Sequence, residues 1–520
     1  MAIPIIDIFA GPGGLSEGFS RLRNGKDKPV FKVKLSIEKD QNAHQTLQLR
    51  SFFRQFKDNE APPEYYSLLQ DKYSGDWATA KAKLFELFPK QGRRAEKETW
   101  CTTLGEVCNS EVDKRIAKAI DRKRNWVLIG GPPCQAYSIA GRGRVGGIDS
   151  RDHRVYLYEQ YLRIIAVHQP SVFVMENVKG LLSAKIQGEN IFDKIKQDLQ
   201  QPGSSFDLPS SEYRILSFVK SPCAITLDGK PEYCENTDFL IRSEDYGIPQ
   251  TRHRVILLGI RNDIDLVNMS TLQRREWKNI EDAIGDLPVL RSGISSRKQE
   301  EGSYDSYTSA QLVDNSSNWL ALIKSFYNQP ESGKLMSAIA WRTIESKLPN
   351  TKGSNFVKRI SSPDDQFLQD WYMDVNLEGV YNHESRSHMV SDLSRYFYLS
   401  LYAFVHGYSL KLSHEEFLPH LVPKHKNARS GKFNDRFRVQ IKGYPATTIT
   451  SHISKDGHYF IHYDFYQCRS LTVREAARIQ TFPDNYFFCG SRTSQYVQVG
   501  NAVPPLLAYQ LSKIVYRLVR

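Results

Sequence analysis

The sequence predicts an α/β fold with a largely parallel sheet, and three apolar segments carry that prediction. Pro4–Ala10 is an apolar run followed by the glycine-rich turn Gly11–Gly14 and then by a helical pattern. Phe31–Ile37 is a second strand candidate, about one βαβ unit later, and it ends in Glu38. Trp126–Ile129 is a third run, and two glycines and two prolines follow it. Apolar runs bounded by such turn residues are typical of buried strands.

Length and charge narrow the class of protein. A chain of 520 residues is long enough for about two or three domains. With 40% hydrophobic and 25% charged residues, its composition is that of a globular protein with a sizeable core. The net charge of +12 predicts affinity for a polyanion, with nucleic acid as the leading candidate. A merely basic globular protein remains the alternative at this point.

The cysteines and the N-terminus exclude several other classes. Seven cysteines are dispersed without a CxxC pair or zinc-ligand spacing, so no metal site is predicted. An odd, dispersed set favours a reducing cytoplasm. The N-terminus lacks the basic region of a signal peptide, and no apolar run approaches the roughly 20 residues of a membrane span. We therefore expect a cytoplasmic protein without a membrane partner.

The first turn and the end of the second strand form a candidate nucleoside site. The glycine turn lacks the GxGxxG spacing of a dinucleotide site, and no Gly-Lys-Ser/Thr follows it, which excludes a Walker loop. In doubly wound folds an acid at the position of Glu38 hydrogen-bonds ribose hydroxyls. An acid without a phosphate cradle favours a nucleoside over a nucleotide. The alternatives are a structural turn and a solvated acid.

Reactive side chains follow two further strand candidates. Cys134 ends the Gly-Gly-Pro-Pro turn, where open α/β sheets place their ligands, and Glu176 follows the apolar run Ser171–Met175. Arg252 and Arg254 directly precede another apolar run. The alternatives are a free cysteine in a structural turn, an acid bonded to local backbone, and surface arginines.

Six segments, in order, resemble motifs of the cytosine-5 DNA methyltransferases. They are Asp7–Gly14, Gly131–Gln135, Phe173–Val178, Tyr246–Arg254, Arg469–Pro483 and Gly500–Pro504. The resemblance implies a Rossmann-like, S-adenosylmethionine-dependent methyltransferase sheet with helices on both faces, and a smaller, mostly irregular and β target-recognition domain. It implies a catalytic domain of residues 1–265, completed by 468–520, and a target-recognition domain of residues 266–467. Residues 50–100 and 200–236 depart from a minimal family member, the first as a partly helical insertion and the second as a loop-like one.

The resemblance also implies a covalent reaction. The Cys134 thiolate would add to C6 of cytosine, so that C5 becomes enamine-like and attacks the methyl group of S-adenosylmethionine. Loss of the C5 proton and expulsion of Cys134 would restore the ring. Glu176 would protonate or hydrogen-bond N3 of the base, and Arg254 would pair with O2 or order Cys134 and Glu176. Arg252 would serve structure or a phosphate contact, and Asn177 would hold the backbone.

For the cofactor, the resemblance assigns Phe9 to the adenine face, Glu38 to the ribose and Glu106 to adenine N6. The remaining cofactor-binding assignments are Ala10, Gly11, Gly13, Gly14, Leu15, Pro132, Asn501 and Val503. Lys39 stands where the family often has an aromatic residue, which leaves one face of the adenine pocket open.

For the DNA, the reaction requires the target base to leave the stack. A mobile loop, Ser138–Asp152, would close over the DNA, and the assigned nucleic-acid contacts are Gln135, Ser138, Arg142, Arg144 and Arg252. The stretches Lys424–Arg429 and Arg436–Arg438 fit phosphate and base contacts, although each alone could be a solvated face. Gly443–Tyr463 is predicted to be a β-hairpin with Asp456-Gly457 at its turn.

Together these features predict a bacterial, nucleoid-associated DNA (cytosine-5)-methyltransferase acting on a specific duplex sequence. We expect a monomer in restriction-modification or phage defence, with a restriction endonuclease or defence proteins acting separately. Methylation of RNA, such as tRNA, is one alternative, and a catalytically inactive DNA-binding paralogue is another. A dehydrogenase is a poor interpretation because the glycine spacing is wrong.

Overall fold

The computed structural model describes residues 2–56, 60–70, 77–133, 155–186, 188–227, 229–267, 269–295, 313–335, 340–423 and 434–520. These residues fold into two units. Unit 1 consists of Met1–Pro62, Ala78–Trp277 and Asn501–Arg520, and unit 2 consists of Pro63–Trp77 and Lys278–Gly500. Among the described residues, no helix has the length and apolar character needed to cross a membrane.

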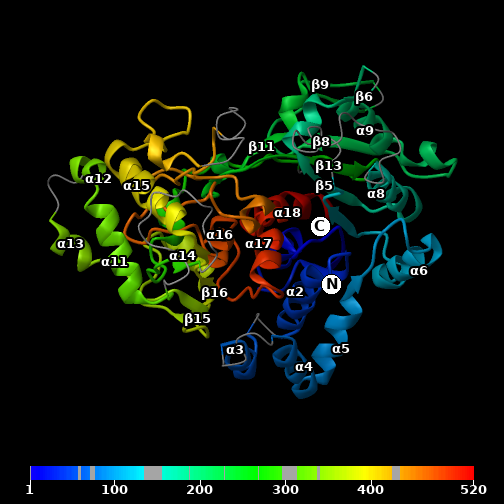
Figure 1. Ribbon diagram of the computed structural model, residues 1–520. Helices are drawn as coiled ribbons and strands as arrows, with labels where there is room; N and C mark the ends of the chain where they lie inside the picture. The colour runs from blue at the N-terminus through cyan, green and yellow to red at the C-terminus, as the bar shows by residue number, and fades with distance from the viewer. Residues whose placement is uncertain are drawn as a thin grey trace. The chain divides into compact units, whose positions relative to one another are not determined.

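Unit 1 is built on an eight-stranded mixed sheet (Figure 1). Its strands are β1 (Ile3–Ile8), β2 (Phe31–Glu38), β3 (Thr99–Cys101), β4 (Val127–Gly130), β5 (Val172–Val178), β8 (Tyr213–Ser217), β11 (Leu240–Arg242) and β13 (His253–Arg261). The strand order is β11-β13-β5-β4-β1-β2-β3, and β8 also pairs with β13. The predicted fold class and the four predicted strands at residues 4–10, 31–37, 126–129 and 171–175 are therefore confirmed.

One strand of this sheet, β13, runs against all the others. The strands β3, β2, β1, β4 and β5 are mutually parallel, whereas β13 runs antiparallel to β5, β8 and β11. The turns that follow β1, β2, β4 and β5 therefore meet at one edge of the sheet. This edge is where ligands bind in open α/β sheets.

Helices flank the sheet of unit 1. They are α1 (Gly14–Ser20), α2 (Gln41–Phe53), α4 (Trp77–Leu87), α5 (Pro89–Glu98), α6 (Asn109–Ile120), α8 (Val155–His168), α9 (Ile191–Gln200) and α18 (Pro505–Val519). An apolar core of buried residues joins the sheet to α6, α8 and α9 on one face. In Figure 1 the C-terminal helix α18 lies beside the N-terminal segment, where it packs against α1. Through this contact the C-terminal helix completes unit 1.

The two insertions differ in how well they were predicted. Residues 50–100 contain the end of α2 together with α4, α5 and, in unit 2, α3 (Pro63–Gln70), as the helical prediction required. Residues 200–236 are not only loop, because β8 lies within them and pairs with β13 in the main sheet. They also hold the hairpin β9 (Ala224–Ile225) and β10 (Pro231–Glu232). The other short strands of unit 1 are β6 (Lys185–Ile186), β7 (Glu189–Asn190) and β12 (Gln250–Thr251).

Unit 2 contains more helix than strand. Besides α3, its helices are α10 (Ile280–Ile284), α11 (Ser316–Tyr327), α12 (Pro330–Leu335), α13 (Trp341–Glu345), α14 (Gln366–Tyr372), α15 (Val390–His406), α16 (Val473–Ile479) and α17 (Arg492–Asn501). Its strands are β14 (Gly293–Ile294), β15 (Gly353–Lys358), β16 (Gly379–Glu384), β17 (Ser387–His388) and β18 (Ala446–Thr447). This differs from the predicted, mostly irregular and β region, because α11 and α15 supply much of the apolar core.

The hairpin predicted at Gly443–Tyr463 is absent from the structure. Only β18 and a short 3₁₀ turn, Ser451–Ser454, form there, and Ile461 makes isolated bridges to Val439 and Ser470 instead. The Asp456 carboxylate accepts a hydrogen bond from the His458 amide, which fixes a local turn rather than a two-stranded ladder. The Asp-Gly signal thus marked a turn correctly but did not specify a hairpin.

Residues 468–520 are divided between the two units. Residues 501–520, with α18, belong to unit 1, whereas 468–500, with α16 and most of α17, belong to unit 2. The assignment of residues 1–265 and 468–520 to catalysis, and of 266–467 to target recognition, stays a prediction.

Candidate active site

A carboxylate and a guanidinium meet near the ligand-binding edge of the unit 1 sheet. Glu176 lies on β5 and Arg254 on the antiparallel strand β13, where Ile256 is directly opposite Glu176. Residues two apart on a strand share a face, so Arg254 lies diagonally beside Glu176. Arg254 Nε is 2.8 Å from Glu176 Oε1, and the two side chains are only 15% and 14% exposed. The structure therefore brings together two of the three predicted catalytic residues.

The turn after β4 runs directly against this carboxylate. A Cβ atom built on Gly131 would lie 2.9 Å from Glu176 Oε2, so a side chain at this position would press on the carboxylate. Pro132 is buried, and Pro133 is the last described residue before a gap. Cys134, Gln135, Ser138, Arg142 and Arg144 lie outside the described residues, as does the predicted loop Ser138–Asp152.

Arg252 and Asn177, which lie near Arg254 and Glu176 in the sequence, occupy positions that suit a structural role. Arg252 is only 1% exposed, and burial holds the pKa of its guanidinium well below its usual value, with Arg254 adding to the effect. This position favours the structural role among the two roles considered for Arg252. The Asn177 side chain accepts a hydrogen bond from the Val178 amide at 2.8 Å, as expected of a residue that holds the backbone.

The first glycine turn forms a second element of the same edge. Gly11 and Gly13 have φ angles of 56° and 95°, a region that favours glycine. The Gly11 amide donates to Glu38 Oε2 at 2.8 Å, and the Asp40 amide donates to Glu38 Oε1 at 2.7 Å. Burial raises the pKa of Glu38, and these two amides oppose that rise. A Cβ atom on Gly11 would meet no atom within 4 Å, so open space lies beside this turn.

Phe9 and Ala10 join β1 to the glycine turn. Phe9 adopts a φ of 55°, which is unfavourable for a non-glycine residue and is tolerated chiefly at functional sites. Its ring packs against the core of unit 1. Ala10 is held on both sides, since its amide donates to Ile37 and its carbonyl accepts from the Gly13 amide.

The C-terminal segment of unit 1 approaches the start of α1. A Cβ atom on Gly14 would lie 2.1 Å from the Val503 carbonyl oxygen, so only glycine fits at this contact. Leu15 and Val503 are buried, whereas Asn501 is exposed. Two segments that are almost 500 residues apart in the sequence, and that both carry predicted cofactor contacts, are thus in contact.

Two positions assigned to the predicted adenine pocket are exposed. Glu106 is exposed in the turn between β3 and α6. Lys39 is also exposed and follows Glu38 at the end of β2. Glu106 thus follows the end of β3 in the chain, but its side chain is not enclosed by other residues.

Asp7 was not singled out from the sequence, although it lies within the first motif. It is 1% exposed on β1, and among the described residues neither of its carboxylate oxygens has a hydrogen-bond partner. The nearby Ser16 hydroxyl donates to the Gly13 carbonyl instead. Burial raises the pKa of Asp7 to about 7, and Ser16 and Arg54 only partly oppose that rise. An acid inside an otherwise apolar strand was the signal available in the sequence.

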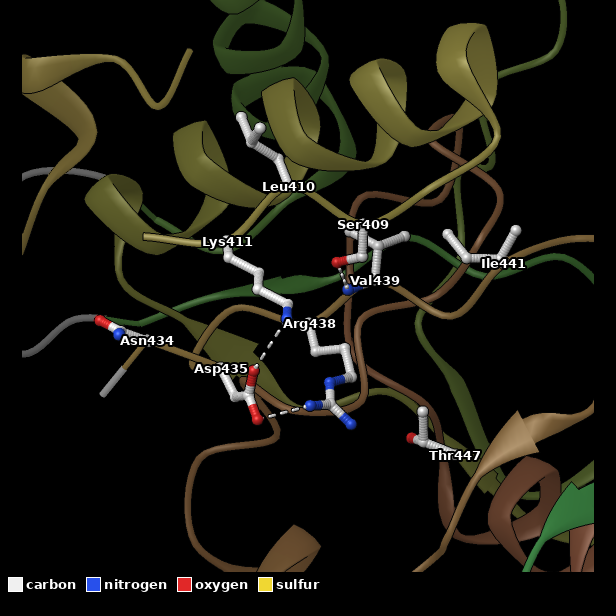
Figure 2. A pocket seen from close by; sticks show the side chains of 9 residues that line it. All are labelled: Ser409, Leu410, Lys411, Asn434, Asp435, Arg438, Val439, Ile441 and Thr447. Atoms are coloured by element: carbon white, nitrogen blue, oxygen red, sulfur yellow. Dashed lines mark hydrogen bonds and ion pairs between the residues drawn. The ribbon is translucent and has the colours of Figure 1, made fainter. Parts of the chain in front are cut away.

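Unit 2 has a pocket of about 190 Å³ (Figure 2). It is lined by Ser409, Leu410, Lys411, Asn434, Asp435, Arg438, Val439, Ile441 and Thr447. The Asp435 carboxylate pairs with Arg438 at 2.8 Å and with Lys411 at 4.0 Å, as the dashed lines in Figure 2 show.

The pocket borders one of the two basic stretches noted in the sequence. Arg436 pairs with Asp456 at 3.0 Å, and Phe437 is buried against His458, so this aromatic ring is not available to stack on a base. Lys424–Arg429 lies outside the described residues. Of the described members of these stretches, Arg438 is the cation that lines the pocket.

Comparison with known proteins identifies relatives along the whole chain. The model of the C-5 cytosine-specific DNA methylase family matches residues 87–217 and 235–517. The type II methyltransferase M.Bpa9945I of Bacillus paralicheniformis is 32% identical over 530 residues, which cover 98% of each chain. The type II methyltransferase M.DdeI of Desulfomicrobium norvegicum is 27% identical over 526 residues, which cover 98% of this chain and 87% of the relative.

The fold has a counterpart among solved structures. A crystal structure of a DNA modification methyltransferase candidate, encoded within an E. coli prophage, covers 99% of both chains with a TM-score of 0.50 and 19% identity. This likeness concerns the fold alone. The family match and the full-length relative carry the assignment, and the chain belongs to the C-5 cytosine-specific DNA methylase family and is a DNA (cytosine-5)-methyltransferase.

Proposed function

We propose that this enzyme modifies one short duplex DNA sequence as the protective half of a restriction-modification system, with S-adenosylmethionine as methyl donor and Cys134 as nucleophile. The observation that carries the proposal is the Glu176–Arg254 pair, which lies against Gly131 of the turn that leads to Cys134. The names of the relatives, type II methyltransferases, support the biological setting.

In the proposed reaction the Cys134 thiolate forms a bond to C6 of a flipped cytosine. Negative charge then develops toward N3 and O2, and C5 gains enamine character. C5 forms a bond to the transferred methyl group, a base removes the C5 proton, and the C6–S bond breaks to return the thiolate. Bound S-adenosylmethionine supplies the electrophilic methyl group and leaves as S-adenosylhomocysteine.

Glu176 and Arg254 have complementary parts in this proposal. The Glu176 carboxyl group hydrogen-bonds or protonates N3, where charge accumulates after thiolate addition. The Arg254 guanidinium holds Glu176 in place through the 2.8 Å contact of its Nε, and its Nη1 donates to the His253 carbonyl at 2.9 Å. In the proposed reaction its Nη2 interacts with O2. Because both side chains are largely buried on adjacent strands, they are ordered before the base arrives.

The residues around the first glycine turn fit an adenosyl ligand. Open space beside Gly11 lets a ligand approach the protein backbone closely. Glu38, at the end of β2, offers its carboxylate oxygens to the ribose hydroxyls. Phe9 offers an apolar ring to the adenine, and Gly14 with Val503 closes the methionine end. The remaining assigned contacts, which are Ala10, Gly13, Leu15, Glu106, Pro132 and Asn501, stay predictions.

For target recognition we assign a base-reading role to Arg438. A guanidinium can bond the O6 and N7 atoms of guanine in the major groove, and a fixed carboxylate partner lowers the freedom it loses on binding. Asp435 is such a partner at 2.8 Å. Arg438→Ala is expected to weaken specific binding by about 1–3 kcal/mol and to relax the sequence preference at one base pair.

A matched variant separates base reading from general electrostatics. Lys411→Ala removes a cation that lines the same pocket, and it should weaken binding to specific and random DNA equally. Gel-shift titrations of both variants against the recognition sequence and a scrambled duplex measure this difference. Equal losses on both duplexes for Arg438→Ala would remove the base-reading assignment.

The decisive experiment expresses the protein and a Cys134→Ser variant in a bacterial host that lacks cytosine methylation. Bisulfite sequencing of the resident plasmid should reveal protected cytosines in one short motif, and these should be absent with the variant. Unprotected DNA from a folded protein that binds S-adenosylmethionine would contradict the proposal, and methylated transcripts from the same cells would then redirect it to RNA.

Three further expectations belong to this proposal. A separate restriction endonuclease or defence protein should cleave the same motif when it is unmethylated. The enzyme should act as a monomer on the bacterial nucleoid. Size-exclusion chromatography with light scattering tests the oligomeric state. Protection of the plasmid against digestion tests the pairing with an endonuclease.

A further inference from the structure

Two cysteines flank a small hairpin that the proposed function does not use. Cys223 directly precedes β9, and Cys234 follows β10 by two residues. The hairpin is antiparallel, with Ile225 opposite Pro231 and Ala224 opposite Glu232. The Cys223 amide extends this ladder by donating to the Glu232 carbonyl at 2.8 Å. The backbone pairing therefore holds both cysteines at the open end of the same hairpin.

The two thiols face each other at the surface. Both cysteines are exposed and free, and the Cys223 thiol donates to the Glu232 carbonyl at 3.3 Å, which places it beside the segment that carries Cys234. The Cys234 thiol in turn is hydrogen-bonded to the Cys223 thiol, which raises the pKa of Cys234. A disulfide requires Cα atoms about 4.4–6.8 Å apart and side chains that point toward each other. The register sets Cys223 opposite Tyr233, and Cys234 is one position beyond. Because β10 ends at Glu232 and the chain bends at Cys234, the alternation of side chains along a strand does not turn the Cys234 thiol away from Cys223.

The hairpin is also anchored to the main sheet. The Tyr233 hydroxyl accepts a hydrogen bond from the Ser217 amide on β8 at 2.8 Å. The Tyr233 ring packs on Phe239 at a centroid separation of 4.7 Å. Because Tyr233 is adjacent to Cys234, this anchor keeps one thiol in place while the other approaches it. The cysteine pair is therefore ordered by contacts outside the hairpin itself.

This segment lies outside the parts of the chain that match the family model. The matched residues end at 217 and resume at 235, so both cysteines and the hairpin fall between them. The pair is thus separate from the residues assigned to the methylation reaction.

We propose that Cys223 and Cys234 form a reversible intramolecular disulfide, a modification site whose oxidant is a low-molecular-weight disulfide such as oxidised glutathione. One thiolate attacks the glutathione disulfide, forms a mixed disulfide and releases one glutathione thiolate. The second cysteine thiolate then attacks the protein sulfur, forms the Cys223–Cys234 bond and releases the second glutathione. The protein loses two protons and two electrons, and one glutathione disulfide becomes two thiols.

The sequence offers a direct readout. Trypsin cleavage after Lys220 and Arg242 yields a single peptide that contains both cysteines, because Lys230 precedes a proline. The full-length protein is incubated anaerobically with oxidised glutathione, digested without reductant and analysed by mass spectrometry. The expected peptide is lighter than its reduced form by two hydrogen atoms and carries no glutathione, and dithiothreitol restores the original mass. A second cleavage after Glu232 should leave the two halves joined until reductant is added.

Variants identify the partners. In Cys223→Ser the remaining Cys234 should keep a glutathione adduct, and Cys234→Ser should leave one on Cys223. Cys108→Ser is the matched control, because Cys108 is also exposed but its thiol contacts Ser110 rather than a second cysteine, so the Cys223–Cys234 bond should form in it unchanged. Separate glutathione adducts on both cysteines of the unaltered protein, cross-links to Cys101 or Cys108, or two thiols that stay free would each overturn the proposal. Since none of these readouts depends on methylation, the result is independent of the proposed function.

Discussion

The two units of this protein use the charged residues of their sequence motifs differently. In unit 1 the strands of the sheet are largely apolar, and the ionisable side chains Glu38, Glu176 and Arg254 lie at or near strand ends, although the helices α1 and α2 share the buried ion pair Glu17–Arg50. In unit 2 several arginines, acids and histidines lie deep in the interior. A recognisable sequence motif can therefore have either a catalytic or a structural use. In unit 1 motif residues surround a reactive edge, and in unit 2 they hold the chain together.

The motif Arg469–Pro483 shows the structural use most clearly. The Arg469 guanidinium pairs with the Glu475 carboxylate at 2.6 Å, and both side chains are 1% exposed. Arg478 pairs with Asp484 at 2.8 Å and also with Asp286. Arg474 donates to the carbonyl groups of three residues, which are Tyr381, Pro483 and Tyr486. Through Tyr381 and Asp286, the guanidinium groups of Arg474 and Arg478 therefore join segments that are distant in the sequence.

Replacing the carboxylate at the strand end of unit 1 should give the largest change, and it should affect activity alone. Glu176→Gln removes the acid that interacts with N3, and we expect methylation to slow by about 10²- to 10⁴-fold. The melting temperature should change little, because the amide can still accept from Arg254. Methyl-transfer kinetics and thermal denaturation of the same preparation measure both effects. A slowing of less than tenfold would contradict the role of Glu176.

Removing an interior guanidinium of unit 2 should instead act on stability. Arg478→Met leaves the carboxylates of Asp484 and Asp286 buried without their partner, which should cost about 3–5 kcal/mol of unfolding free energy. Lys358→Met is the control, because Lys358 and Glu378 form an exposed pair in unit 2 that should contribute no more than about 0.5 kcal/mol. Urea denaturation compares the two variants. Similar losses for both would show that the interior network is not what stabilises unit 2.

Asp7 is a buried acid within a strand of the unit 1 sheet, and its titration tests whether an acid at that position is costly. Its pKa in the folded protein is about 7, against an ordinary value of 3.8, so the folded state holds the proton more tightly. The stability that this proton contributes is present below pH 3.8 and is lost as the pH rises through 7. Three pKa units correspond to at most about 4 kcal/mol.

The variant Asp7→Asn cannot ionise, so it should escape this loss. Its melting temperature relative to the unaltered protein should rise between pH 5 and pH 8 in cofactor-free samples. An unchanged difference across this range would mean that Asp7 does not titrate there.

The buried histidines of unit 2 should give a smaller change with the opposite pH dependence. Burial lowers the pKa of His383 to about 4, while the unfolded chain titrates near 6.5. The unfolded state therefore binds more protons between these values, and stability falls as the pH drops through this window. The loss from this one group should reach about 2 kcal/mol by pH 5.

His383→Gln should reduce the acid sensitivity of unit 2. Denaturation midpoints at pH 7 and pH 5 give the comparison, and His420→Gln, at an exposed histidine, should behave like the unaltered protein. If His383→Gln is as acid-sensitive as His420→Gln, the sensitivity comes from other groups, among them His388 and His458, whose pKa values burial also lowers.

Local sequence patterns predicted the parts of the fold that depend on local physics. The segments that form β1, β2, β4 and β5 are short and bounded by turn residues, so their strands were evident. The strands β1, β4 and β5 are almost wholly buried, whereas β2 exposes Lys32 and Lys34 on one face. The ends of these strands also placed Glu38 and Glu176 correctly at the ligand-binding edge. By contrast, β8 was missed because it lies between polar, proline-containing segments, and its pairing with β13 depends on chain far along the sequence.

The sequence by itself determined the fold class, the order of the motifs and the residue types that the chemistry requires. Only the tertiary structure decided that Arg254 faces Glu176, that Gly131 touches the same carboxylate, and that Gly14 packs on Val503. It also decided that Arg252 and Phe437 are buried and that residues 468–500 belong with unit 2. Residue type and strand propensity are local properties, whereas burial and ion pairing depend on which distant segments pack together, and a single sequence does not state that packing.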